Sequence, residues 1–103
     1  MRNRLKFKIR LKKEKLTETN LSVCRVNVGE SQQNKFEYLK NAVFTKFKMF
    51  GLTEDNFALY WQDSDGEFII IADNDDLSLA LEELDGPMYE LIVCMNAMNT
   101  NGK

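Results

Sequence analysis

Residues 5–11 alternate strictly between apolar and cationic side chains, reading Leu-Lys-Phe-Lys-Ile-Arg-Leu. Successive side chains of a β-strand point to opposite faces, so this segment is predicted to be a strand with one face in the core and one in water. Residues 21–28 are rich in β-branched side chains and end at Gly29, which predicts a second strand, antiparallel to the first. The polar residues 12–20 are predicted to connect the two. The chain is therefore predicted to begin with a β-hairpin that carries positive charge on its outer face.

After residue 34 the apolar residues recur at intervals of three and four, which is typical of one face of a helix. The side chains of this face are Phe36, Leu39, Val43, Phe47 and Phe50. Asn34 and Glu37 have the spacing of a capping box at the start of the helix, and Gly51 stands where a C-cap glycine belongs. We expect the aromatic stripe to lie in the core rather than to bind a cofactor.

The second half of the chain shows the same two kinds of pattern. They predict strands at residues 57–61, 67–72 and 89–95, a turn at residues 63–66, and a helix with the apolar stripe Leu77, Ala80, Leu81 and Leu84. Asp73 or Asn74 is expected to cap this helix, and residues 85–87 to end it. The last strand is mostly apolar, as expected for a central strand that is buried on both faces.

The predicted order is ββαββαβ, an α+β fold with two helices on a mixed sheet. This order matches the ubiquitin-like β-grasp roll, although a fold alone carries no function. A chain of 103 residues that is 44% hydrophobic suits one small domain. We assign the domain to residues 1–96 and expect the polar residues 97–103 to form a disordered tail.

Missing residue types exclude several chemistries. The chain has no histidine, so Ser–His and Cys–His nucleophilic pairs and His-bound zinc are excluded. Cys24 and Cys94 have apolar neighbours and are expected to be small buried hydrophobes, neither metal ligands nor disulfide partners. We therefore expect no enzyme activity, no metal and no cofactor. Because the sequence shows neither a transmembrane run nor a secretory signal, we expect a cytoplasmic protein.

Charge is divided between the two halves of the chain. Residues 1–50 hold 13 Lys and Arg against 4 Asp and Glu, whereas residues 51–103 hold 1 against 12. Such asymmetry indicates charged interaction surfaces. A compact domain with one positive and one negative pole can bind a copy of itself head to tail.

Residues 63–76 concentrate much of the negative charge, and we considered three interpretations. A calcium loop that begins at Asp63 needs Gly at its sixth position and Glu at its twelfth, but Gly66 is fourth and Asn74 is twelfth. General acid–base catalysis needs a cleft that shifts carboxyl pKa values, which a highly charged turn does not provide. A rigid carboxylate array that accepts Lys and Arg side chains from a partner fits the pattern best.

Residues 61–77 resemble the acidic OPCA motif of Phox-and-Bem (PB-one) domains. In that motif an aromatic residue leads into Asp-x-Asp/Glu-Gly-Asp/Glu, then apolar strand residues, then an acidic pair and Leu at the start of a helix. Every element occurs here, from Trp61 through the turn at residues 63–67 to Leu77. The resemblance covers nearly the whole chain and implies an acidic binding face formed by Asp63, Asp65, Glu67, Asp75 and Asp76.

Phox-and-Bem domains of the two-faced class also carry a basic face, centred on a Lys between apolar residues in the first strand. Lys8, between Phe7 and Ile9, is similar to that residue as it stands in sequestosome-type selective autophagy receptors. Those receptors carry a double Arg in the second strand; here Arg25 matches one of the pair and Cys24 stands in the other place. The resemblance therefore implies a basic face of Lys8 and Arg25, and the period of the first strand adds Lys6 and Arg10.

The resemblance implies head-to-tail homo-oligomerisation, into rings or filaments, of a scaffold or a ubiquitin-binding selective autophagy receptor. Two alternatives remain open. One is a module that pairs only with a different Phox-and-Bem protein in a signalling complex. The other is a binder of RNA or anionic lipid that uses residues 2–15, which the acidic second half disfavours through repulsion. We expect partners to be further copies of the chain and other Phox-and-Bem proteins, with no nucleic acid and no membrane.

Overall fold

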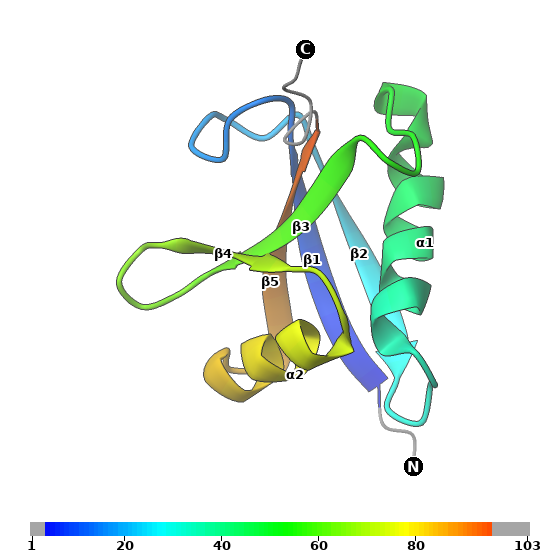
Figure 1. The fold of residues 1–103 in the computed structure, drawn as a ribbon, viewed down its shortest axis with the longest axis vertical. Helices are drawn as coiled ribbons and strands as arrows, with labels where there is room; N and C mark the ends of the chain where they lie inside the picture. The colour runs from blue at the N-terminus through cyan, green and yellow to red at the C-terminus, as the bar shows by residue number, and fades with distance from the viewer. Residues whose placement is uncertain (1–3, 96–103) are drawn as a thin grey trace.

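The computed structural model describes residues 4–95. Its elements are β1 (Arg4–Lys12), β2 (Ser22–Gly29), α1 (Lys35–Phe47), the 3₁₀ turn η1 (Lys48–Phe50), β3 (Phe57–Gln62), β4 (Phe68–Ile71), α2 (Asn74–Glu83) and β5 (Met88–Met95), as Figure 1 shows. The order ββαββαβ is as predicted. The tail predicted at residues 97–103 lies outside the described residues.

The five strands form one sheet in the order β2-β1-β5-β3-β4. β1 and β5 pair in parallel, and the other neighbouring pairs are antiparallel, so the sheet is mixed. This is the ubiquitin-like β-grasp arrangement. β5 lies at the centre, and its residues 91–95 are all buried, which confirms the prediction of a central strand covered on both faces.

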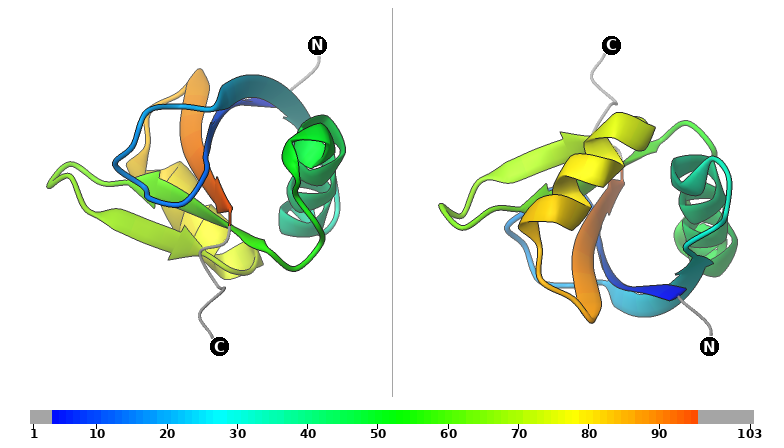
Figure 2. Two further views of the ribbon diagram at one scale, coloured as in Figure 1. Left: turned by 90° about the horizontal axis from the view of Figure 1, so that it is seen from above. Right: turned by 90° about the horizontal axis from the view of Figure 1, so that it is seen from below.

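A single apolar core joins the sheet to both helices. Alternate β1 side chains enter it, and Phe7, Ile9 and Leu11 have no exposed surface. α1 lies against the β2 side of the curled sheet and α2 lies beside β4 (Figure 2). The helical stripes fill the space between them, with Phe36, Leu39, Val43, Phe47, Leu77 and Ala80 buried. Among residues 4–95 no charged or polar side chain is buried, so the charges of this part of the chain lie on its surface.

The capping box predicted at Asn34 and Glu37 is wrong. Asn34 has a left-handed backbone (φ 51°, ψ 58°) and makes no side-chain cap, because a side-chain cap requires an extended N-cap backbone. Instead, the N–H of Phe36 donates to Oδ1 of Asn74, 2.9 Å away in the first turn of α2. One helix therefore caps the start of the other.

The remaining helix ends follow the sequence more closely. The Asp73 side chain accepts the N–H of Asp76 and is the N-cap of α2. α1 ends at Phe47 and tightens into η1, and Gly51 stops the turn with φ 103° and an N–H bond to the Lys48 carbonyl. Phe50 is half-buried at this point. β4 is one residue shorter at each end than predicted.

Both cysteines are free, with Cys94 buried and Cys24 half-buried. Burial raises the pKa of each thiol, which favours the unreactive protonated form. No helix within residues 4–95 is both long enough and apolar enough to cross a membrane.

Candidate functional site

The outer face of β1 and β2 gathers cations. Lys6 and Lys8 point away from the core, and Arg25 of β2 lies directly opposite Lys8 in the antiparallel register. Like charges at directly opposed positions destabilise a sheet. A local rule that is broken in this way marks a candidate functional position. We call Lys6, Lys8 and Arg25 the strand face.

A shallow hollow of about 270 Å³ lies on the strand face. Its lining includes Lys6 and Arg25, diagonal neighbours across the two strands, together with Asn27 and Met88. Within residues 4–95 the one ion pair joins Arg10 to Glu90, so no carboxylate of the described chain forms an ion pair with Lys6, Lys8 or Arg25. This surface can therefore accept carboxylates from a partner.

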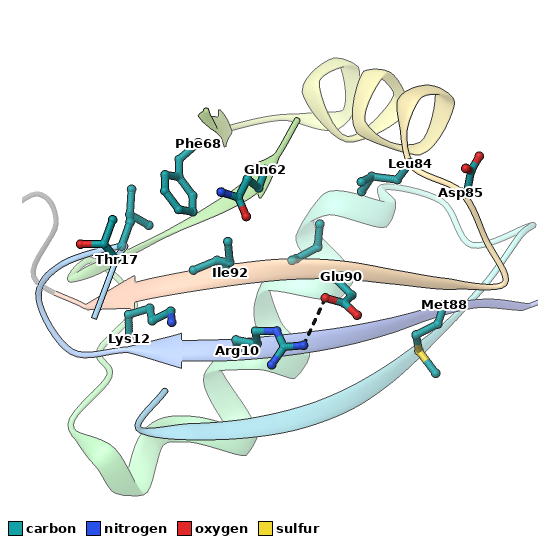
Figure 3. Close-up of a pocket in the computed structure, with 12 residues that line it drawn as sticks. Arg10, Lys12, Thr17, Gln62, Phe68, Leu84, Asp85, Met88, Glu90 and Ile92 are labelled. Carbon is teal, nitrogen blue, oxygen red and sulfur yellow. Dashed lines mark hydrogen bonds and ion pairs between the residues drawn. The ribbon is translucent and has the colours of Figure 1, made fainter. Parts of the chain in front are cut away.

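Arg10 differs from the other predicted cations. Its Nη2 lies 3.2 Å from Oε1 of Glu90 on the neighbouring strand β5, and this pair lies in a groove of about 600 Å³ (Figure 3). The β1–β2 connection, the β3–β4 hairpin and the segment between α2 and β5 surround the groove. Glu90 is also the β5 partner of Lys8 in the parallel register. An acidic side chain thus lies within the basic region, which the sequence prediction did not include.

The β1–β2 connection is held by Glu18. Its Oε2 accepts the backbone N–H groups of Glu14 and Lys13 at 2.8 and 2.7 Å. These bonds, with the Glu14 bond the largest, lower the pKa of Glu18. The Lys12 ammonium donates to the Glu18 carbonyl, so Lys12 is tied to this connection rather than to the strand face.

Asp63 shapes the turn between β3 and β4. Its Oδ1 accepts the N–H groups of both Asp65 and Glu67, each at 2.9 Å, and its backbone N–H donates to the Glu67 carbonyl. Gly66 supplies the left-handed backbone (φ 85°) that the turn requires. Asp65 and Glu67 are exposed. Asp63 therefore holds the turn that presents their carboxylates.

Asp76 has a comparable role at the start of α2. Its Oδ2 accepts the N–H of Ala72 at 2.8 Å, and its own N–H donates to Oδ1 of Asp73 at 2.9 Å. Asp75, next to it, is exposed. Three of the predicted acidic residues, Asp65, Glu67 and Asp75, expose their carboxylates to a partner, and we call them presenters. The other two, Asp63 and Asp76, bind backbone N–H groups with their carboxylates, and we call them organisers. Asp at the first position of a turn, three residues before its glycine, and Asp three residues after a helix cap are the signals from which the organisers could have been predicted.

The five carboxylates form two patches rather than one. The turn precedes β4 and the acidic start of α2 follows it, so the patches lie at opposite ends of that strand (Figure 1). We call Asp63, Asp65, Glu67, Asp75 and Asp76 the acidic face. The acidic face flanks β4 at one edge of the sheet, and the strand face lies on β2 and β1 at the other side of it.

The described residues also limit the chemistry. Within residues 4–95 no three Cys, Asp or Glu side chains are grouped so that they could hold a metal ion. The strand face and the acidic face are therefore candidate interaction surfaces rather than parts of a metal site.

Neither a family model nor a curated protein matches the sequence. Solved structures do match. The solution structure of the PB1 domain of Cdc24p (long form) is 19% identical, with a TM-score of 0.61 over 89% of this chain and 95% of that one. The chain has the PB1 fold. PB1 abbreviates Phox and Bem, so the fold implied by the sequence resemblance is confirmed.

Two further PB1 structures show the same likeness. The AtNBR1-PB1 domain is 18% identical, with a TM-score of 0.59 over 90% of this chain and 98% of that one. The cryo-EM structure of the AtNBR1-PB1 filament (L-type) is 20% identical, with a TM-score of 0.52 over 91% and 97%. At this identity the comparison establishes the PB1 fold of the chain, and the roles of its charged faces must be argued from its own residues.

Proposed function

We propose that this PB1-fold domain is a protein-interaction module that assembles with itself, the strand face of one copy docking on the acidic face of the next. The observation that carries the proposal is the position of the two faces toward opposite edges of one sheet. Since neither face covers the other, one copy can hold two neighbours at once.

Such a contact is heterologous, because different surfaces meet. A heterologous contact grows into rings or filaments, whereas a symmetric contact closes at a dimer. A filament is the form recorded for AtNBR1-PB1, a neighbour of similar fold. A polymer also gives avidity to any weak binding site joined to it. This property suits a cytoplasmic scaffold or a selective autophagy receptor that binds ubiquitin-tagged cargo.

Lys8 and Arg25 are the cations we assign to the centre of the contact. The backbone register places them opposite each other, so a carboxylate between them can interact with both. Removing one partner from a hydrogen-bonded interfacial charge pair costs about 2–5 kcal/mol, or about 30-fold in affinity at the lower end. We therefore expect Lys8→Ala and Arg25→Ala each to weaken assembly by ~30-fold or more without unfolding the chain.

Complementation between two variants tests the direction of the contact. The first carries Lys8→Glu and Arg25→Glu. The second carries Asp65→Ala, Glu67→Ala and Asp75→Ala, and retains both organisers so that the turn and the α2 cap stay intact. Each alone should be a monomer, and the mixture should form a 1:1 complex and nothing larger.

A matched control carries Lys13→Glu and Lys15→Glu, the same change of charge on exposed residues of the β1–β2 connection. It should assemble as the unsubstituted chain does. If the mixture stays monomeric while both proteins remain folded, the head-to-tail proposal is wrong. If the unsubstituted chain is itself a monomer but binds a second PB1 protein, the heterodimer alternative is correct. A complex that forms only with added RNA or anionic vesicles supports the remaining alternative.

A further inference from the structure

The outward side of α2 presents an apolar residue among carboxylates that the head-to-tail contact does not use. Leu79 is 56% exposed. Glu82 and Glu83, three and four residues later, lie beside it on the helix surface and are exposed. We call Leu79, Glu82 and Glu83 the acidic helix face.

Glu82 and Glu83 are unfavourable for their own helix. They lie at the C-terminal end of α2, where the helix dipole is negative and cations are favoured, and the last turn contains no basic residue. The one ion pair among residues 4–95 joins Arg10 and Glu90, so no cation of the described chain compensates them. A partner that brings cations would relieve this repulsion.

α1 and η1 present the complementary surface. Met49 is 81% exposed and Tyr38 is 45% exposed. Lys46 and Lys48 are exposed nearby on the same helix and its 3₁₀ extension. We call Tyr38, Lys46, Lys48 and Met49 the basic helix face. Residues 35–50 contain four Lys and one Glu, whereas residues 74–83 contain four acids and no cation.

We propose that the basic helix face of one copy docks on the acidic helix face of a second copy. This contact is separate from the head-to-tail contact between the strand face and the acidic face, which we call the strand-to-turn contact. Leu79 packs against Met49, while Lys46 and Lys48 approach Glu82 and Glu83; Tyr38 lies about three turns away, at the other end of α1. α2 is the shorter helix, since 10 residues span about 15 Å against about 20 Å for the 13 residues of α1, so α2 can lie wholly along α1. Within one chain α1 and α2 meet at their N-terminal turns, where Asn74 accepts the Phe36 N–H. The acidic helix face and the Lys46–Met49 end of the basic helix face lie toward the other ends of the two helices, so contact between them requires two copies.

This contact rests on the proposed function only in taking a second copy as the partner. Acidic helix faces repel each other, as do basic ones, so the contact is also heterologous. In a filament it links copies that the strand-to-turn contact does not join directly, and the two contacts reinforce each other through avidity.

Disulfide trapping between single-cysteine variants tests the contact. All variants carry Cys24→Ser, and the remaining Cys94 is buried. Leu79→Cys in one copy is mixed with Met49→Cys in another under mild oxidation, and linked dimers are followed on non-reducing gels. Thr53→Cys, exposed in the loop before β3, is the matched control. The 49–79 pair should link ~tenfold faster than the 53–79 pair, and Leu79→Cys alone no faster than the control. Equal rates for the 49–79 and 53–79 pairs overturn the proposal.

Charge reversal makes the test specific. Lys46→Glu with Lys48→Glu in the Met49→Cys copy should slow linking about tenfold, the sum expected for two exposed ion pairs turned repulsive. Glu82→Lys with Glu83→Lys in the Leu79→Cys copy should then restore it. Failure of this restoration overturns the assignment of these charges.

Disulfide trapping repeated in copies that all carry Lys8→Glu and Arg25→Glu tests the helix contact independently of the proposed head-to-tail contact. Linking of the 49–79 pair above the control, at raised protein concentration, supports the helix contact even if the complementation experiment fails. Loss of that linking at every concentration overturns the helix contact and leaves the strand-to-turn proposal standing on its own test.

Discussion

At the residue scale, Glu90 limits the strength of the strand face. It pairs with Arg10 at 3.2 Å and lies beside Lys8 in the β5 register, so it places a negative charge where an acidic partner would dock. Glu90→Gln should strengthen head-to-tail association about two- to fivefold, the range expected for one exposed charge interaction. Sedimentation equilibrium measures the change, with Glu54→Gln, an exposed carboxylate before β3, as the control. A weaker association would show instead that Glu90 positions Arg10 for the partner.

Variants of Asp63 distinguish the effect of its charge on the acidic turn from the effect of its hydrogen bonds. Asp63→Ala removes the acceptor of two backbone N–H groups and should lower the free energy of unfolding by about 1–2 kcal/mol. Asp63→Asn keeps the Oδ1 acceptor and should leave the stability nearly unchanged. Urea denaturation compares the two, and Asp65→Asn serves as a charge control. If Asp63→Ala proves as stable as Asp63→Asn, the two hydrogen bonds do not hold the turn.

At the element scale, α1 depends on α2 for its N-terminal cap, whereas α2 is capped by its own Asp73. Asn74→Ala removes the acceptor of the Phe36 N–H and should destabilise the fold by about 1 kcal/mol, as loss of an N-cap does. Asn74→Asp retains an acceptor oxygen and should cost less. Thermal denaturation measures both, with Asn41→Ala on the exposed side of α1 as the control. No effect of Asn74→Ala would mean that water caps α1 equally well.

Local sequence patterns predicted the helices and strands. Features that depend on contacts between distant residues, such as the cap of α1 and the Arg10–Glu90 pair, were not predicted. Alternation located β1, and the intervals of three and four located the buried faces of both helices, because these periods are properties of a single element. The cap of α1 was predicted wrongly because its acceptor, Asn74, lies 38 residues from Phe36. The Arg10–Glu90 pair spans 80 residues and depends on the parallel pairing of β1 with β5. For the acidic face, the sequence predicted which residues take part. It did not predict which of them are organisers and which are presenters, because that difference depends on the hydrogen bonds of the turn.

At the scale of the whole molecule, the fold converts a division of charge along the chain into a division in space. The cationic first half supplies β1, β2 and α1, and the acidic second half supplies the β3–β4 turn and α2. The sheet order then carries β2 and β4 to opposite edges. Since the core of residues 4–95 is entirely apolar, the charges of the strand face and of Asp65, Glu67 and Asp75 contribute little to holding the fold together and are free to act between copies.

Association of the unsubstituted chain should therefore respond to salt while its folding does not. The Debye length falls from about 30 Å at 0.01 M to about 3 Å at 1 M, so contacts between exposed charges weaken as salt rises. Sedimentation velocity should show species that grow past the dimer with concentration at low salt and a folded monomer near 1 M, with an unchanged circular dichroism spectrum. A limit at the dimer would indicate a symmetric contact. Persistence of the oligomer near 1 M salt would indicate an apolar interface and would contradict both charged contacts proposed for this domain.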